Sequence, residues 1–399
     1  MTALSKLQVW TQPVWLILIT APFLAIAVKE PGTYRAVFGF GGQDHKIAAV
    51  TLAGFGLSSG IVLSLIAQIG EQVDFLRFMP DKTTANRRAW WASVITAGPG
   101  WVVFSVLKLF GGVFLAFYVA DRAGFSKAVE PVQQYLHATG AWLPAGALGV
   151  AVFFVVLSQL KINTTNAYSG SLSFANFFSR TLHRHPGRAI WVLLHLAIAL
   201  TLMEVGIFAF LNFVLGFFSN VGIAWIGAIV ADLVINKPLG LSPSYIEFKR
   251  AHLCNFNPVG FGSMLLASAV AIAAFFGAFG GLAHALAPFI ALVLAMTLSP
   301  LIAWLTGGRY YIARADELDE PLLDADGLPS AATYTCIVCG TAYERPDVAA
   351  CPHHDGVICS LCCSLEAHCH DTCKSGLVID LGIPAPRAVT HGGGQLAPR

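Results

Sequence analysis

The sequence predicts an all-α polytopic membrane protein with eight transmembrane helices, followed by a small cytosolic zinc-binding module. Only 12% of its 399 residues are charged and 56% are hydrophobic, whereas a soluble domain carries about 25% charged residues. Apolar runs close to the roughly 20 residues that span a bilayer recur along the chain. Eight of the nine cysteines fall between Cys336 and Cys373, which indicates one local metal-binding module.

The apolar runs define eight candidate spans, which we expect to be helical because a backbone in lipid must satisfy its own hydrogen bonds. Their approximate bounds are 13–28, 47–70, 90–120, 142–177, 188–204, 206–235, 259–283 and 285–306. Lysines and arginines concentrate after every second span, which predicts cytoplasmic termini at both ends. A signal peptide is the alternative for the first run, and it would leave an odd number of spans.

The composition changes after residue 308 and predicts four regions. Residues 1–308 form the transmembrane domain, and residues 309–332 are an acidic, proline-containing linker. Residues 333–374 hold the cysteines and histidines of the module, and residues 375–399 are predicted to be disordered.

Polar and small side chains interrupt the fourth span in the stretch KINTTNAYSGSLSFANFF, residues 161–178. Asn163, Asn166 and Gly170 share one helical stripe there. One interpretation is helix packing, in which small residues allow close approach and amides bond across the interface. The other is an oxygen-rich surface that binds a cation and a polar solute.

The second span carries a glycine cluster, Gly54, Gly56 and Gly60, before Gln68. Glycines weaken a helix, and interrupted helices often form the binding sites of secondary transporters. The glycines therefore permit this helix to break.

Four segments carry a family resemblance through their order and spacing. They are EQVDFLRFMP, KINTTNAYSGSLSFANFFSR, GAIVADLVINKPLG and NFNPVGFGSMLLAS. Together they resemble the nucleobase–cation symporter family, the permeases for cytosine, purines, uracil, allantoin and hydantoins. The resemblance covers about residues 1–310. It implies a partial inverted-repeat fold, shared with sodium-coupled amino-acid transporters, in which the eight spans match family helices five to twelve and the first four are absent.

The resemblance also implies a transport site. A hydroxyl pair that binds the coupling ion in the family is matched by Thr164 and Thr165, and that ion would be Na⁺ or H⁺. The residues expected near the solute are Asn163, Asn166, Gly170, Gln68 and Ser64. The function implied is cation-coupled transport of a nucleobase or a related heterocycle.

Permease-like helices joined to a cysteine module are also similar to the input half of some bacterial sensor kinases. The alternative function is therefore a sensory or regulatory module that binds a solute and signals through the zinc module to a cytosolic partner. Both resemblances imply a bacterial inner membrane. No kinase core follows residue 374, and the sequence has no phosphate loop, nucleophile elbow or dinucleotide fingerprint, so we predict no enzymatic activity. A net charge of +2 gives no basis for nucleic-acid binding.

The cysteine–histidine region contains four short ligand pairs with spacings typical of zinc sites. The pairs are Cys336/Cys339, Cys351/His354, Cys359/Cys362 and Cys369/Cys373, with His353 and Cys363 as substitutes. Eight ligands predict two zinc ions. In one arrangement the first and third pairs bind one zinc ion and the second and fourth pairs bind the other, as in RING- and B-box-like folds. In the other arrangement, neighbouring pairs share an ion. The spacing leaves both arrangements open.

Other uses of these cysteines are less consistent with the sequence. Disulfides require an oxidising compartment, whereas the charge pattern places the module in the cytosol. An iron–sulfur cluster lacks its usual spacing here. So short a module cannot fold on a hydrophobic core alone, so we expect the metal to supply its folding energy and to be structural. Cys254, outside the module, is expected to be a free thiol.

Overall fold

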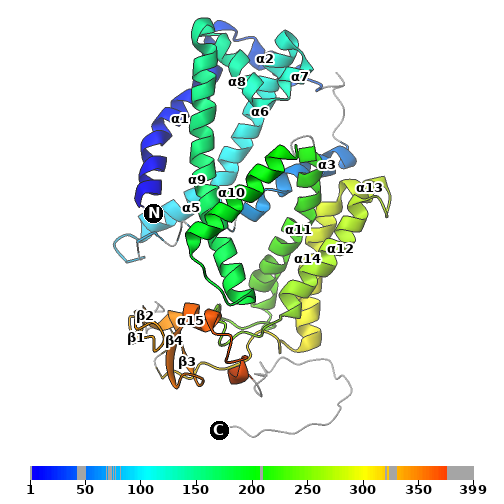
Figure 1. Ribbon diagram of the computed structural model, residues 1–399. Helices are drawn as coiled ribbons and strands as arrows, with labels where there is room; N and C mark the ends of the chain where they lie inside the picture. The colour runs from blue at the N-terminus through cyan, green and yellow to red at the C-terminus, as the bar shows by residue number, and fades with distance from the viewer. Residues whose placement is uncertain are drawn as a thin grey trace. The chain divides into compact units, whose positions relative to one another are not determined.

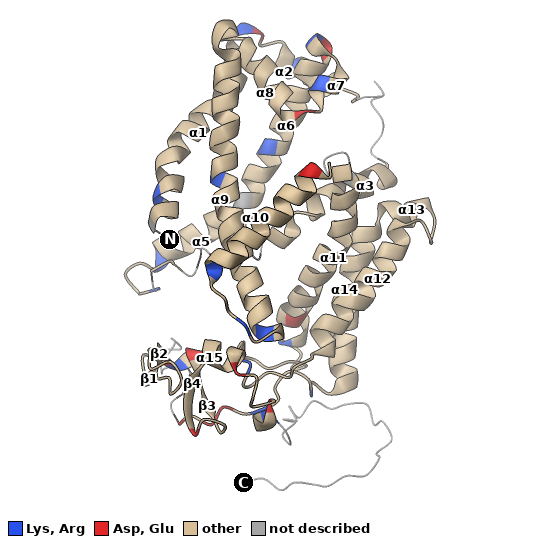
Figure 2. Cartoon of the chain, in the orientation of Figure 1, with Lys and Arg blue, Asp and Glu red and all other residues tan. Residues whose placement is uncertain are grey.

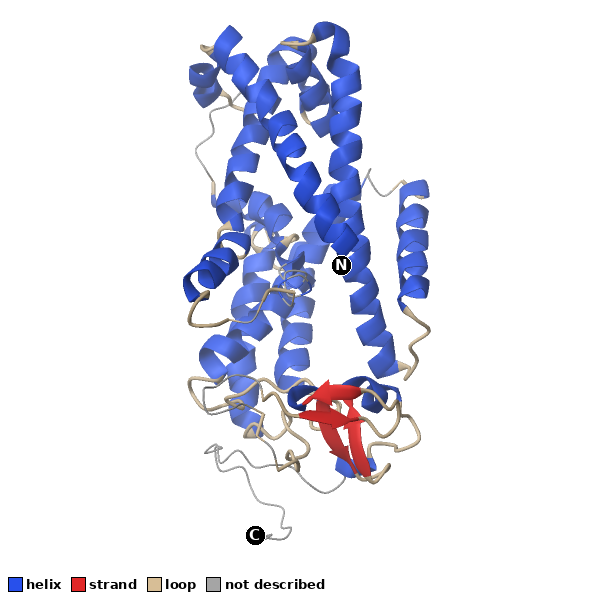
Figure 3. Ribbon diagram, turned by 90° about the vertical axis from the view of Figure 1, so that its left-hand side faces the viewer, coloured by secondary structure: helices blue, strands red, loops and turns tan. Residues whose placement is uncertain are grey.

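The structure is a computed structural model that is 68% helical, and the strands among the residues it describes all lie in the C-terminal module (Figures 1 and 3). It describes residues 2–42, 51–68, 70, 74, 76, 78–80, 82–206, 210–319, 321–322 and 330–374. The predicted disordered tail, the start of the second predicted span and parts of the predicted linker lie outside these residues.

Six helical stretches in the described residues have the length and composition of membrane spans, in agreement with the predicted all-α membrane protein. They are Ala3–Lys29, Arg87–Ala123, Pro144–Thr181, Phe213–Asn236, Pro258–Phe275 and Ala287–Thr306. Few charged residues occur along them (Figure 2). The other two predicted spans fall on shorter helices, α3 (Leu52–Leu63) and α10 (Arg188–Glu204). The total of eight spans stays a prediction.

The chain divides into two compact units, Met1–Thr51 with Ile69–Ser171, and Leu52–Gln68 with Leu172–Arg399. The elements of the first unit are α1 (Thr2–Lys29), α2 (Thr33–Ala36), η1 (Val37–Gly39), α5 (Arg87–Ala97), α6 (Trp101–Ala123), α7 (Phe125–Ala128), α8 (Pro131–Gly140), η3 (Pro144–Gly146) and α9 (Ala147–Thr181) as far as Ser171. Its buried core includes Ile26, Phe114 and Val119.

Polar side chains of α9 bond across to α1 within the first unit. The Lys161 ammonium donates to the Gln8 carbonyl at 3.1 Å and to the Thr11 hydroxyl at 3.0 Å. The Trp15 indole donates to the Ser158 hydroxyl at 2.9 Å. Polar groups in a membrane find such partners on a neighbouring helix, and for the stripe of Asn163, Asn166 and Gly170 both interpretations stay predictions.

Three apolar helices of the second unit pack side by side, α11 (Leu211–Ala231), α12 (Ser263–Phe275) and α14 (Ala287–Thr306) (Figure 1). The other membrane elements of this unit are α3, η2 (Ile66–Gln68), α10, η5 (Asp232–Asn236), η6 (Pro258–Gly262) and α13 (Gly281–Ala285). Alanines dominate the contact of α11, α12 and α14, with Ala224, Ala267 and Ala295 fully buried. Small side chains let these helices approach closely, as is typical of membrane interfaces.

The second predicted span forms an unbroken α-helix through its three glycines and leaves that geometry only after Leu63. The α-helical part of α3 ends at Leu63, and a 3-10 turn, η2, follows. Gly56 has a packing role as well, because a Cβ atom there would lie 2.5 Å from the carbonyl oxygen of Ala285 on α13.

Substitution Gly56→Ala is expected to lower stability by about 1–3 kcal/mol, because the added methyl meets rigid backbone and forces α3 away from α13. Thermal unfolding of the chain in detergent measures this effect. Gly149→Ala on α9 is the matched control, since a Cβ there meets nothing within 4 Å. Equal behaviour of the two variants would contradict the close contact.

Candidate metal centre and solute cavity

The module is built from two short antiparallel hairpins and one helical turn (Figure 3). Strand β1 (Thr333–Thr335) pairs with β2 (Ala342–Glu344), with Tyr334 opposite Tyr343. Strand β3 (Val348–Cys351) pairs with β4 (Gly356–Cys359), and α15 (Ser360–Leu365) follows directly. Two 3-10 turns, η7 (Arg345–Asp347) and η8 (Thr372–Lys374), complete it.

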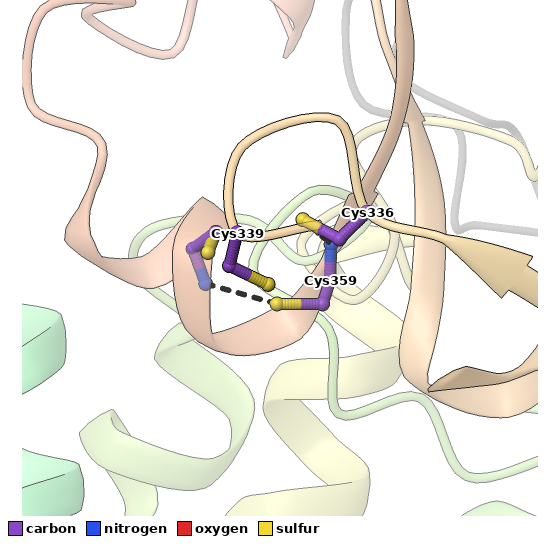
Figure 4. A group of neighbouring side chains, drawn as sticks. Cys336, Cys339 and Cys359 are labelled. Atoms are coloured by element: carbon purple, nitrogen blue, oxygen red, sulfur yellow. Dashed lines mark hydrogen bonds between the residues drawn. The ribbon is translucent and has the colours of Figure 1, made fainter. Parts of the chain in front are cut away.

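Four cysteines from three places in this fold converge. Their sulfur atoms all lie within 4.8 Å of one another, and we call them the four-cysteine cluster: Cys336, Cys339, Cys359 and Cys362. Cys336 follows β1, Cys339 lies in the turn after it, and the other two lie at the end of β4 and on α15 (Figure 4). The first and third predicted ligand pairs are thus brought together, as in the cross-braced alternative.

The donor set of this cluster fits a tetrahedral zinc ion. Zn–S bonds of ~2.3 Å place neighbouring sulfurs about 3.8 Å apart, which small side-chain rotations achieve from the observed spacing. Backbone N–H groups already point at the sulfurs, with Cys359 N–H donating to Cys336 Sγ at 3.3 Å and Cys362 N–H to Cys359 Sγ at 3.4 Å. The backbone N–H of Thr341 and the Tyr343 hydroxyl lower the pKa of Cys339 to about 6, whereas burial raises the pKa of Cys359 and of Cys362.

The second predicted ligand set is arranged differently. His354 pairs with Glu366, its Nε2 lying 3.0 Å from Oε2, and these two gather with His353. Cys351, Cys369 and Cys373 line a separate small pocket together with Cys363. The predicted use of His354 as the fourth ligand of that set therefore stays a prediction.

Arginine contacts hold the module to a loop of the second unit, residues 237–257, which we call the docking loop. Arg250 donates to the carbonyl oxygens of Cys363 and Glu366 at 2.7 and 2.8 Å. The same guanidinium pairs with Asp371 at 3.0 Å, and Asn255 donates to that carboxylate at 2.8 Å.

A row of buried charges, here called the ion-pair chain, connects the docking loop to the module through the linker. Glu247 lies 3.7 Å from the Lys249 ammonium, which lies 3.5 Å from Asp316, and Asp316 lies 3.0 Å from the Arg345 guanidinium. The Lys249 and Arg345 side chains are only 2% and 1% exposed. Buried charges must be paired, so these four residues depend on one another.

Burial raises the pKa of Glu247. Hydrogen bonds from His252 and from the backbone N–H of Lys249 lower it, and so does the positive charge of Lys249. The pKa of Glu247 is therefore below its ordinary value. For Asp316, burial likewise raises the pKa, and bonds from the Leu318 N–H and Arg345 lower it further than burial raises it. Both carboxylates are therefore charged at neutral pH.

A cavity of about 590 Å³ lies beside the docking loop, within the size range of small-molecule sites. Its lining is mostly apolar and includes Trp225, Tyr245 and Phe261. Two π-helical segments, η5 and η6, border it, and such segments frequently mark functional sites.

A polar cluster occupies one side of this cavity. The Tyr311 hydroxyl donates to Asp232 at 2.6 Å. The buried Asn236 amide donates to the Ser299 hydroxyl at 3.0 Å. Glu247 of the ion-pair chain also lines the cavity. An apolar, aromatic cavity with a few carboxylates and hydroxyls suits a flat molecule that carries hydrogen-bond donors.

A scan against protein-family models and searches of curated proteins and of solved structures find no match to this chain. The assignment of function therefore rests on the geometry of the metal cluster, the cavity and the contacts between them.

The predicted transport residues do not line either of these two cavities. The Thr164 and Thr165 hydroxyls donate to carbonyls of their own helix, those of Leu160 at 2.8 Å and Ile162 at 2.7 Å. Ser64 similarly donates to the Ile61 carbonyl at 2.6 Å. Asn163, Asn166 and Gly170 belong to the first unit and Ser64 and Gln68 to the second, and the transport site stays a prediction.

Sequence reasoning missed the cavity and the ion-pair chain. One signal was available, since Asp232 and Asn236 are four residues apart on a helix near its end. The partners Ser299 and Tyr311 come from more than 60 residues away, and no local pattern connects them.

Proposed function

We propose that this chain is a membrane sensory or regulatory protein that binds a heterocyclic solute in the cavity beside the docking loop and signals through its zinc module. The observation that carries the proposal is the position of Glu247, which lines the cavity and begins the ion-pair chain to Arg345 of the module. The proposed role is binding, not catalysis, with the module on the cytoplasmic side and available to a signalling partner.

Solute binding can reach the module through competition for Glu247. A donor group on the solute would compete with His252, whose Nδ1 lies 2.8 Å from the carboxylate, and with Lys249. Because Lys249 also pairs with Asp316, a change at Glu247 alters the charges that hold Arg345. A ligand shifts an equilibrium only through such differential interaction with two states.

The proposal predicts binding without uptake. We expect radiolabelled cytosine, uracil or allantoin to bind the chain in proteoliposomes without accumulating, with or without a sodium gradient. Bound solute should change hydrogen exchange in residues 360–374. The Asp316→Asn variant should still bind the solute. It should lose most of the solute-induced change in hydrogen exchange, because Asp316 is the third residue of the ion-pair chain.

Asp319→Asn is the matched control for this experiment, since it removes an exposed carboxylate of the same linker. The control should behave as the natural chain does. Sodium-dependent accumulation of the solute would contradict the sensory proposal, and so would an exchange response that Asp316→Asn leaves intact.

The second candidate function is cation-coupled transport, favoured by the break between α3 and η2 and by the family resemblance of residues 1–310. Under this proposal Thr164 and Thr165 bind the ion, Na⁺ or H⁺. Uptake that Thr165→Ala abolishes would support transport, whereas uptake that this variant leaves unchanged would argue against that ion site.

A further inference from the structure

The module contains a second group of cysteines that the four-cysteine cluster does not use. Cys351, Cys363, Cys369 and Cys373 line one pocket, which we call the cysteine pocket. Its volume of about 20 Å³ is close to that of a single water molecule under the same measure. The space is thus the size of an ion and not of an organic ligand.

Four separate places in the fold supply these cysteines. Cys351 ends β3, Cys363 lies on α15, Cys369 lies in the turn before η8, and Cys373 lies in η8 itself. His370 and Asp371 between the last two adopt left-handed backbone, with φ of 45° and 55°. That conformation is uncommon for residues other than glycine, and here it reverses the chain so that Cys369 and Cys373 line the same pocket.

We propose that Cys351, Cys363, Cys369 and Cys373 form a second zinc centre, with Cys363 in the place that the sequence assigns to His354. Four thiolates are one of the usual donor sets of a closed structural zinc site. His354 does not line the cysteine pocket, and it pairs with Glu366 instead. Each thiol gives up its proton to solvent as it binds, so no oxidant or reductant takes part.

Charges of both signs surround the cysteine pocket, because Glu366 and Asp371 line it together with Arg314. A zinc ion with four thiolates carries a net charge of −2, which must be balanced when it is buried. Arg250 donates to the Cys363 carbonyl at 2.7 Å. Arg314, whose side chain is 2% exposed, lines the pocket. Because Arg250 also pairs with Asp371 and Arg314 with Glu317, these two guanidinium groups offset only part of that charge.

The position of the pocket gives the second centre a role distinct from that of the first. Ala251 of the docking loop and Arg314 of the linker line it beside the four cysteines. The sulfurs are more widely spaced than those of the four-cysteine cluster, which lie within 4.8 Å of one another. Metal binding would draw the side chains inward and tighten the module against the docking loop.

Metal content of the purified full-length chain in detergent tests the proposal. We expect two zinc ions per chain in the natural protein and one in Cys363→Ser and in Cys373→Ser. His354→Ala, the matched control, should retain two. A single ion in the natural protein, two ions in Cys363→Ser, or one ion in His354→Ala would each overturn the ligand set.

Cobalt substitution covers the case in which a serine variant loses both ions by unfolding. The thiolate-to-cobalt charge-transfer band grows with the number of thiolates, so two four-thiolate sites predict equal intensity per ion at the first and second equivalents. A weaker band at one of them would indicate a histidine ligand and overturn the proposal. Detection of a disulfide among these four cysteines in the denatured, alkylated chain would also overturn it.

Discussion

Cys359→Ser is expected to unfold the module while the membrane helices stay folded. Cys359 is 1% exposed and belongs to the four-cysteine cluster. Structural zinc contributes about 10–16 kcal/mol to the folding of small zinc domains, far more than so small a core can replace. The hydrophobic contacts of the module centre on Cys336, Ile358 and Cys359 themselves, so loss of the metal removes the core together with the site.

Limited proteolysis of the full-length chain in detergent, followed by mass spectrometry, measures this effect. Cleavage between residues 333 and 374 should become at least tenfold faster in Cys359→Ser, and a zinc chelator should have the same effect on the natural protein. Cys254→Ser is the control, because Cys254 lies outside both groups of cysteines and should leave the cleavage rate unchanged. A module that resists protease after chelation would show that the metal is not structural.

The sequence was informative about features that depend on local pattern. Apolar runs predicted the membrane helices, and the C-x-x-C spacing predicted the ligand pairs Cys336/Cys339 and Cys359/Cys362 while leaving open which pairs share an ion. Each of these features depends on neighbouring residues or on a ligand spacing that is known in advance. The sequence predicted eight spans, but α10 has 17 residues and is slightly shorter than a helix that crosses a bilayer.

The docking of the module was beyond sequence reasoning. Lys249 and Arg250 belong to the lysines and arginines whose distribution along the sequence predicts the topology. In the structure Lys249 is buried and Arg250 is mostly buried, and both bond to groups far along the chain, Lys249 to Asp316 and Arg250 to the carbonyls of Cys363 and Glu366. A basic residue in a loop has the same local pattern whether it faces water or a buried carboxylate, so only the tertiary structure separates these two cases.

Lys249→Met is expected to destabilise the contact between the docking loop and the module by about 3–5 kcal/mol, the usual cost of removing one partner from a buried charge pair. Methionine nearly preserves the volume of the side chain, so the loss is electrostatic. The substitution removes the ammonium group that pairs with both Glu247 and Asp316. Hydrogen exchange of residues 247–255 and 345–351 should accelerate about a hundredfold or more, in proportion to that free energy.

The pH dependence of this contact follows from the depressed pKa values of Glu247 and Asp316. A carboxylate whose folded pKa is lowered stabilises the protein above its unfolded pKa, and that stability is lost as the pH falls through the folded pKa. We therefore expect protection in the natural chain to decline as the pH falls below the ordinary values of 4.5 and 3.8. The decline should be shallower in Lys249→Met, because the Lys249 charge helps to lower both pKa values.

Lys127→Met provides the comparison, since Lys127 is exposed in a loop-proximal helix of the first unit and exposed substitutions usually change stability by less than about 0.5 kcal/mol. It should leave both the exchange rates and their pH dependence as they are in the natural chain. If Lys249→Met matched this control, the buried charges would be balanced without Lys249. The ion-pair chain would then have no role in linking the cavity to the module, because its second member would contribute nothing to the contact.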